Sequence, residues 1–169
     1  MLNKAQAYTF LKQVYQDVIL NLKLDKISDY FSDQYMQVTD GTEVNIQGFR
    51  THMETLKSIV ETLVLSPFYD FLFDEEKQTA TLRYEIHVKK KNGNSGVVEI
   101  IAIFELKDGK ILRCNELTRS LQPDDEFNTI GKINKKIIPK FACTSYVAKP
   151  KPKLRFWLRL ASIRLMFIV

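Results

Sequence analysis

Glu116 is the side chain best suited to acid–base chemistry in this sequence. It lies in the last of several alternating segments, where the two-residue period of a β-strand gives it mostly apolar neighbours on its own face. These neighbours are Leu112, Cys114 and Thr118. Burial among them would raise the pKa of the carboxyl group towards a value useful for proton transfer. Two alternatives stay open, namely an ion pair with Arg83 or Arg119 and exposure to solvent at the mouth of a pocket.

Asp40 is a second candidate acid or base. It ends an earlier segment of strand character, in which it shares its alternation with Met36 and Val38. Asp40-Gly41 is also typical turn chemistry, in which the carboxylate bonds to neighbouring backbone. A catalytic role for Asp40 would require its carboxylate and that of Glu116 to converge on one pocket.

Tyr15 and Tyr84 are candidate hydroxyl donors in a pocket with otherwise apolar walls. A mostly apolar pocket with one or two polar groups suits a small hydrophobic molecule. The candidate ligand-binding residues are Tyr15, Met36, Val38, Tyr84, Leu112 and Cys114. The alternative is that these tyrosines belong to an ordinary core, as regularly spaced aromatic residues usually do.

The sequence contains no motif for metal binding, phosphate binding or nucleophilic catalysis. No set of His, Cys, Asp and Glu has metal-ligand spacing, and neither a phosphate-binding glycine loop nor a nucleophile elbow is present. We therefore expect no cofactor and no metal. His87 lies on the charged face of its predicted strand, and His52 lies at the edge of a helical apolar stripe. The two cysteines, Cys114 and Cys143, match no disulfide framework, and the expected compartment is a reducing cytoplasm.

The elements that position these residues change from helical to strand character along the chain. Apolar spacing predicts a helix from Tyr8 to Leu22, capped by Asn3 and Gln6, a short helix near residues 27–31 capped by Asp25, and a helix from about Gly48 to Leu63. Period-two alternation then predicts strands over residues 34–39, 67–74, 79–89, 97–107 and 110–121. Asp108-Gly109 between the last two strands is a strong hairpin signal. Helices followed by a run of strands indicate an α+β fold with an antiparallel sheet packed on three N-terminal helices.

This order of elements resembles the SnoaL-like domain of the nuclear transport factor 2-like superfamily over about residues 5–121. The segments that carry the resemblance are Tyr35–Val38, Ile46–Phe49 and Leu106–Ile111, the last followed by Asn115-Glu116. The resemblance implies a curved sheet folded into a cone around an apolar pocket, and relatives that are cyclases, isomerases, dehydratases or simple binding domains. Glu116 matches the family's acid near the end of the last strand, and Asp40 loosely matches a base position of ketosteroid-isomerase-like relatives. Val38 stands where many relatives carry His, and Asn115 where an aromatic residue is common.

The C-terminal extension, residues 122–169, differs in charge from the rest of the chain. Residues 1–121 carry 15 Lys and Arg against 17 Asp and Glu, whereas residues 122–169 carry 10 against 3. A mildly acidic body makes nucleic-acid binding by the folded part unlikely. Residues 154–169 combine Arg and Trp with apolar side chains, a composition typical of an interfacial membrane segment. Packing on the body or on a second copy, and a terminus without a structural role, are the alternatives.

Two functions remain in view from the sequence. The first is a cytoplasmic pocket domain that binds a small hydrophobic molecule, with isomerase- or cyclase-type proton transfer by Glu116 and Asp40. The second is a non-catalytic module that forms a homodimer through its sheet, as the superfamily often does, and docks on a membrane or partner through its tail.

Overall fold

Three helical regions precede most of the strands, as the sequence predicts. The structure, a computed structural model, describes residues 1–122, 127 and 129–133. The helical elements are α1 (Lys4–Val14), which continues as a π-helical segment (Tyr15–Leu20), a 3₁₀ turn (Leu24–Lys26), α2 (Ile27–Tyr30), α3 (Ile46–Ile59) and a last 3₁₀ turn, η4 (Ile130–Lys132). The strands are β1 (Phe31–Thr39), β2 (Thr42–Asn45), β3 (Val60–Leu65), β4 (Asp70–Asp74), β5 (Thr79–Lys90), β6 (Ser95–Lys107) and β7 (Lys110–Ser120).

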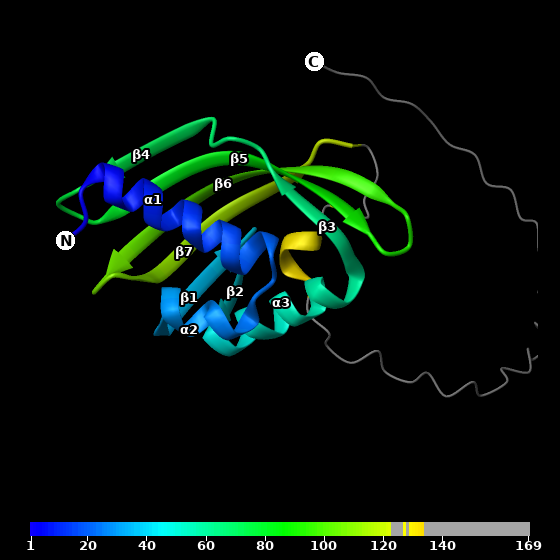
Figure 1. Ribbon diagram of the computed structural model, residues 1–169, viewed down its shortest axis with the longest axis horizontal. Coiled ribbons are helices and arrows are strands. Elements are labelled where there is room, and N and C mark those ends of the chain that lie inside the picture. The colour runs from blue at the N-terminus through cyan, green and yellow to red at the C-terminus, as the bar shows by residue number, and fades with distance from the viewer. Residues whose placement is uncertain (123–126, 128, 134–169) are drawn as a thin grey trace, which may run out of the picture. The chain divides into compact units, whose positions relative to one another are not determined.

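The sheet has seven strands in the order β2-β1-β7-β6-β5-β3, and β4 also pairs with β5. Every pair is antiparallel except β1 and β7, which run parallel. The α+β class is thus confirmed, but the prediction of a wholly antiparallel sheet is wrong. Parallel neighbours need a long connection, and α3 with strands β2 to β6 supplies one between β1 and β7. Figure 1 shows α1 in front of the long strands of this sheet, and α2 and α3 below them beside β1 and β2.

The first helix begins at a capping box, as its sequence predicts. Asn3 Oδ1 accepts a hydrogen bond from the Gln6 backbone N–H at 2.9 Å, and Gln6 Oε1 accepts one from the Asn3 N–H at 3.0 Å. The apolar face of α1 is buried through Ala7, Leu11 and Val14. These contacts fix where the helix starts and which face meets the sheet.

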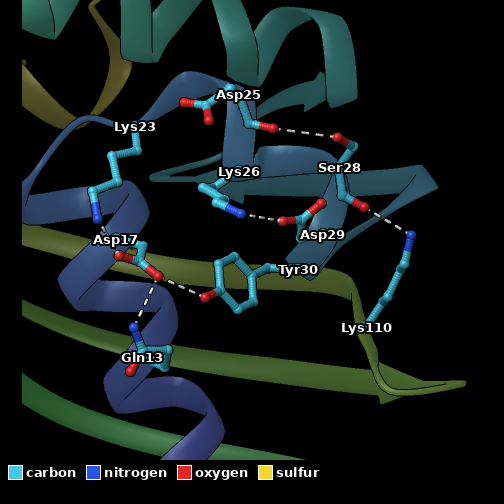
Figure 2. Close-up of polar contacts among 9 residues, drawn as sticks. All are labelled: Gln13, Asp17, Lys23, Asp25, Lys26, Ser28, Asp29, Tyr30 and Lys110. Atoms are coloured by element: carbon cyan, nitrogen blue, oxygen red, sulfur yellow. Dashed lines mark hydrogen bonds and ion pairs between the residues drawn. The ribbon is translucent and has the colours of Figure 1, made fainter.

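A cluster of hydrogen bonds around Asp17 joins the π-helical segment to α2 (Figure 2). The Asp17 carboxylate accepts from Tyr30 Oη at 2.7 Å, from Gln13 Nε2 at 2.8 Å and from Lys23 Nζ at 2.8 Å. The bond from Lys23 is the main reason that the pKa of Asp17 lies well below its usual range. The predicted cap of the short helix, Asp25, does not cap it, because α2 has Lys26 at that position without a side-chain bond.

The third helix ends one turn earlier than predicted. It begins where Asn45 Oδ1 accepts from the Gly48 N–H at 3.0 Å, but it stops at Ile59, and Val60 and Leu63 belong to β3. The pairing of β3 with β5 shifts register between Val60 and Thr62. Because of this bulge, both Val60 and Leu63 point inward although they are three residues apart. The same spacing is typical of the apolar face of a helix, which is why the sequence predicts a longer helix.

The later strands follow their predicted alternation. Ala80, Leu82, Tyr84 and Val88 of β5 are buried, and Asp108 and Gly109 form the β6–β7 turn with φ of 52° and 76°. Such left-handed backbone suits glycine and tolerates aspartate. His87 is exposed, as predicted.

Part of the C-terminal extension packs against this body. The Phe127 ring is buried beneath the ammonium of Lys90, 4.4 Å from its centroid, and Ile130 of η4 is buried as well. The segment 154–169 lies outside the described residues. Within the part of the chain that the structure describes, no helix is long and apolar enough to cross a membrane.

Candidate functional site

A cavity lies between the helices and the inner face of the sheet. It encloses about 110 Å³ and is walled mainly by apolar side chains from the π-helical segment, α3 and strands β5 to β7. A dry apolar cavity of about 150 Å³ binds benzene, so this space suits a molecule of at most about one ring. The polar side chains that line it include Tyr15, Tyr35, Gln37, His52, Tyr84 and Glu116.

Glu116 of β7 is the carboxyl group of this cavity. Its Oε1 accepts hydrogen bonds from Thr39 Oγ1 at 2.7 Å and from Gln37 Nε2 at 2.9 Å. Its Oε2 has one weak contact, with Cys114 Sγ at 3.9 Å. Burial raises the pKa of Glu116, against the opposing effect of the Thr39 and Gln37 donors.

The alternative partners of Glu116 lie elsewhere. Arg83 and Arg119 both pair with Glu99, at 3.4 Å and 2.6 Å, because these residues alternate onto the outward face of β5, β6 and β7. Glu116 itself lines the cavity. Two of its predicted neighbours, Cys114 and Thr118, line the cavity with it, and Glu116 forms no ion pair with either arginine.

A relay of side chains along β1 orients the donors to Glu116. Tyr35 Oη donates to Gln37 Oε1 at 2.8 Å, and Gln37 Nε2 donates to Thr39 Oγ1 at 2.9 Å. The bond from Tyr35 fixes which end of the Gln37 amide faces Glu116. Because Thr39 donates its single hydroxyl proton to Glu116, its oxygen is free to accept from Gln37.

Sequence reasoning placed the wrong face of β1 in the cavity. Tyr35, Gln37 and Thr39 are buried on the inner face, while Met36 and Val38 are only half-buried and do not line the cavity. The polar character of Gln37 and Thr39 made Met36 and Val38 the apparent core positions. The aromatic residues Phe31 and Tyr35, four residues apart, were the sequence signal that could have identified the inner face. The β1–β7 register shifts between Phe31 and Met36, so simple alternation does not hold along the whole of β1.

A second irregularity displaces Leu112. Leu106 pairs with Ile111 whereas Glu105 pairs with Arg113, so Leu112 is the extra residue of a bulge in β7. Ile111 is buried in place of Leu112, which does not line the cavity. Cys114 lies beyond the bulge and keeps its predicted place as a buried lining residue.

Asp40 is held outside the cavity lining. Its carboxylate accepts from the Thr118 N–H at 2.8 Å and from Thr118 Oγ1 at 2.6 Å, and Lys132 Nζ lies 3.6 Å away. With φ of 47°, Asp40 shapes the β1–β2 turn and ties its end to β7. The two candidate carboxylates, Asp40 and Glu116, thus do not converge on one cavity.

Tyr15 and Tyr84, the candidate hydroxyl donors, both line the cavity and are hydrogen-bonded to each other. Their oxygens are 2.6 Å apart, and both side chains are buried. Burial raises the pKa of both phenols, so each keeps its proton. One hydroxyl proton is used within the pair, and the other is available to a molecule in the cavity.

His52 of α3 lies in the wall rather than at the edge of the core. It is 8% exposed, and its Nδ1 is 2.8 Å from the backbone oxygen of Ile133. Ile130 and Gly131 of η4 line the cavity beside it. Burial lowers the pKa of His52. Among the described residues, no three His, Cys, Asp or Glu side chains come together as a metal site would require.

Comparison with known proteins extends this description. None of the protein-family models matches the chain. An uncharacterized protein of Schizosaccharomyces pombe is 21% identical over 126 residues, which cover 74% of this chain and 95% of the relative.

Solved structures share the fold at low sequence identity. AusH from Aspergillus nidulans superposes with a TM-score of 0.64 at 11% identity, over 73% of this chain and 90% of AusH. AclR, a putative hydroxylase from Streptomyces galilaeus, gives 0.61 at 13% identity, over 78% and 99% of the two chains. IdmH, a putative polyketide cyclase from Streptomyces antibioticus, gives 0.57 at 9% identity, over 67% and 91%. Helices precede most of the strands in this chain, and β1 pairs with β7 in the sheet. The chain has the nuclear transport factor 2-like fold of SnoaL-like proteins.

Proposed function

We propose that this protein binds a small hydrophobic molecule in its cavity and that Glu116 exchanges a proton with that molecule. The observation that carries the proposal is a carboxyl group of raised pKa in an apolar cavity, held on one oxygen by Thr39 and Gln37. The names of the similar structures, which include putative polyketide cyclases, support chemistry on carbonyl compounds. The curved, cone-shaped enclosure typical of SnoaL-like proteins would surround the ligand.

The geometry of Glu116 gives its two oxygens different roles. In the neutral acid, Oε1 is the oxygen that accepts both hydrogen bonds, so the proton resides on Oε2. In the ionised form, Oε2 can remove a proton from the carbon next to a carbonyl group. The electron pair of that C–H bond then passes to the carbonyl oxygen, which the spare proton of the Tyr15–Tyr84 pair stabilises. Return of the proton to a different carbon completes an isomerisation without another reactant.

A ring-sized ketone tests both parts of this function. We expect the wild-type chain to accelerate the conversion of 3-cyclohexenone to its conjugated isomer, measured by ultraviolet absorbance, and Glu116→Gln to abolish the acceleration. Thr118→Val is the control for a change in the same wall that leaves the carboxyl group in place. Toluene binding by calorimetry reports the cavity alone, and Leu56→Phe, which fills it, should remove that binding.

The outcomes separate the two parts. Toluene binding without any rate difference between wild type and Glu116→Gln would leave a binding protein and end the acid–base role. No binding of toluene to the wild type would end the cavity function as well.

The outward face of the sheet favours a second candidate function, a homodimeric interaction module. Leu72 and Leu117 on this face are 65% and 66% exposed, and Ile101 and Ile103 are exposed between them. Ile101 lies directly opposite Leu117 in the β6–β7 register, which makes the apolar surface continuous. Its arginines are already paired within the same face, Arg83 with Asp70 and Arg119 with Glu99, so a second copy would meet no uncompensated like charge.

A further inference from the structure

His52 lines the cavity and has a hydrogen-bond acceptor that the proposed function does not use. The partner of its Nδ1 is the backbone oxygen of Ile133, at 2.8 Å. A carbonyl oxygen can only accept, so Nδ1 carries the proton. In a neutral imidazole with its proton on Nδ1, the other nitrogen, Nε2, is an acceptor.

No hydrogen-bond partner of Nε2 is found among the described residues, although His52 is 8% exposed and its side chain lines the cavity. A buried acceptor without a partner destabilises the site that contains it, by an amount comparable with a lost hydrogen bond. Burial also disfavours the protonated imidazole, so protonation of Nε2 does not remove the unpaired acceptor near neutral pH. A molecule in the cavity that donates a hydrogen bond would remove it.

Two other polar groups of the cavity can donate hydrogen bonds. Neutral Glu116 donates from Oε2, and the Tyr15–Tyr84 pair has one proton to donate. These donors stand on the sheet and on the π-helical segment, whereas His52 stands on α3. The cavity therefore offers donors from one set of elements and an acceptor from another.

We propose that His52 is a specificity-determining residue, and that the ligand is a ring-sized molecule with a hydroxyl group that donates to His52 Nε2 and an oxygen acceptor that faces Glu116. This inference rests on the proposed function, because it requires the cavity to hold a ligand. It excludes purely hydrocarbon ligands as preferred ligands. Hydroxylated cyclic ketones and phenols with a carbonyl group have the required combination.

Phenol and toluene form a matched pair of probes for the hydroxyl contact, since they differ mainly in one hydroxyl against one methyl group. We expect His52→Phe to lower the affinity for phenol about fivefold to tenfold, the range of one hydrogen bond, and to leave the affinity for toluene nearly unchanged. Calorimetric titration of the full chain measures both. The matched control is His87→Phe, the same substitution at an exposed histidine, which should change neither affinity.

A second measurement does not depend on a variant that folds. The ¹⁵N chemical shifts of the wild-type His52 ring should show a protonated Nδ1 and a free Nε2, and the Nε2 signal should move when phenol, but not toluene, is added. A proton on Nε2, or an Nε2 signal that ignores phenol, would overturn the inference.

The titrations also distinguish this inference from the proposed function. If toluene binds the wild type and phenol affinity survives His52→Phe, the cavity function stands and the role of His52 is wrong. If neither probe binds, both are wrong.

Discussion

At the scale of single residues, the site depends on how a carboxyl group is kept among apolar side chains. Glu116 receives two hydrogen bonds on one oxygen, which lowers the free-energy cost of its burial without restoring full hydration. Its pKa remains raised, because burial disfavours the charged form more than it would in an exposed glutamate.

The first prediction concerns the pH dependence of stability. The pKa of the Glu116 carboxyl group is higher in the folded state than in the unfolded state, where it is about 4.3. The free energy of unfolding therefore falls as pH rises from the unfolded-state pKa through the folded-state pKa. Glu116→Gln keeps an oxygen for Thr39 and Gln37 but has no charge. The variant should match the wild type in stability at about pH 4 and be the more stable of the two at about pH 7.

Urea unfolding at the two pH values measures this difference. Glu43→Gln, at an exposed position of β2, is the matched control and should behave like the wild type at both. A wild type that is more stable than Glu116→Gln at neutral pH would show that the carboxylate is well solvated and would contradict the prediction.

Glu116 was predictable from the sequence because it lies in a regular stretch of β7. Gln37 and His52 were not, for different reasons. Gln37 is a polar residue on an inner face, and alternation alone assigns such positions to solvent. His52 lies within the cavity wall because Ile133, eighty-one residues further along the chain, supplies a partner for its ring, a contact with no local signal.

At the scale of elements, Ile130 and Gly131 of η4 line one side of the cavity, and the nearby Phe127 ring packs on Gly96 of β6. A Cβ on Gly96 would lie 2.6 Å from the Phe127 ring, so the absence of a side chain in β6 makes room for that ring. A Cβ on Gly131 would lie 3.2 Å from the Thr118 methyl group and 3.3 Å from that of Thr39, which shows how closely η4 approaches the sheet. The binding surface for this segment is therefore formed by Gly96 of β6, Thr118 of β7 and Thr39 of β1.

The second prediction tests the packing of Phe127 on Gly96 with two variants. Phe127→Ala removes the ring, and Gly96→Val fills its place; both should release the segment and speed the exchange of toluene with the cavity at least about tenfold, a change of about 1.4 kcal/mol in the barrier. Line-shape analysis of NMR signals during a toluene titration measures the exchange. Val97→Ile, beside Gly96, is the control. Unchanged exchange in both variants would mean that toluene reaches the cavity by another route.

Most elements were predictable, and two of the errors share one physical origin. Capping residues and hairpin turns are local signals, and they identified the start of α1 and the β6–β7 turn correctly. Bulges are not local, because they depend on the register with a partner strand. Because of the bulge after Val60, the start of β3 has the apolar spacing of a helix. Because of the bulge at Leu112, Ile111 is buried in the core instead of Leu112.

At the scale of the whole molecule, we propose that the outward sheet face mediates the association of two copies. Standard protein interfaces are centred on buried apolar side chains with a polar rim, the composition this face offers. The third prediction is that the wild-type chain forms a dimer and that Ile101→Lys with Leu117→Lys yields a monomer, measured by light scattering after size exclusion. Gln47→Lys, an equal change of charge on an exposed position of α3, should remain dimeric. A wild type that is monomeric at high concentration would contradict the proposal.

The fourth prediction concerns the basic tail. We propose that residues 154–169 contact anionic membranes, because three arginines and a tryptophan accompany their apolar side chains. The full chain should float with vesicles that contain phosphatidylserine, and the variant with Arg155, Arg159 and Arg164 all changed to Glu should not. Equal flotation of the two chains, or none of the wild type, would rule out this contact.

The parallel pairing of β1 with β7 has a consequence for the order of assembly on the ribosome. The two donors to Glu116 are made 79 and 77 residues before their acceptor, so neither can meet it until nearly the whole body has been synthesised. Until then β1 has only the short β2 as a neighbour, and its inward polar side chains stay in water. Such a long-range contact slows folding and leaves the nascent helices without the surface they cover. The cavity is consequently completed late, and a chain interrupted before its final strand would contain α1, α2 and α3 but not Glu116.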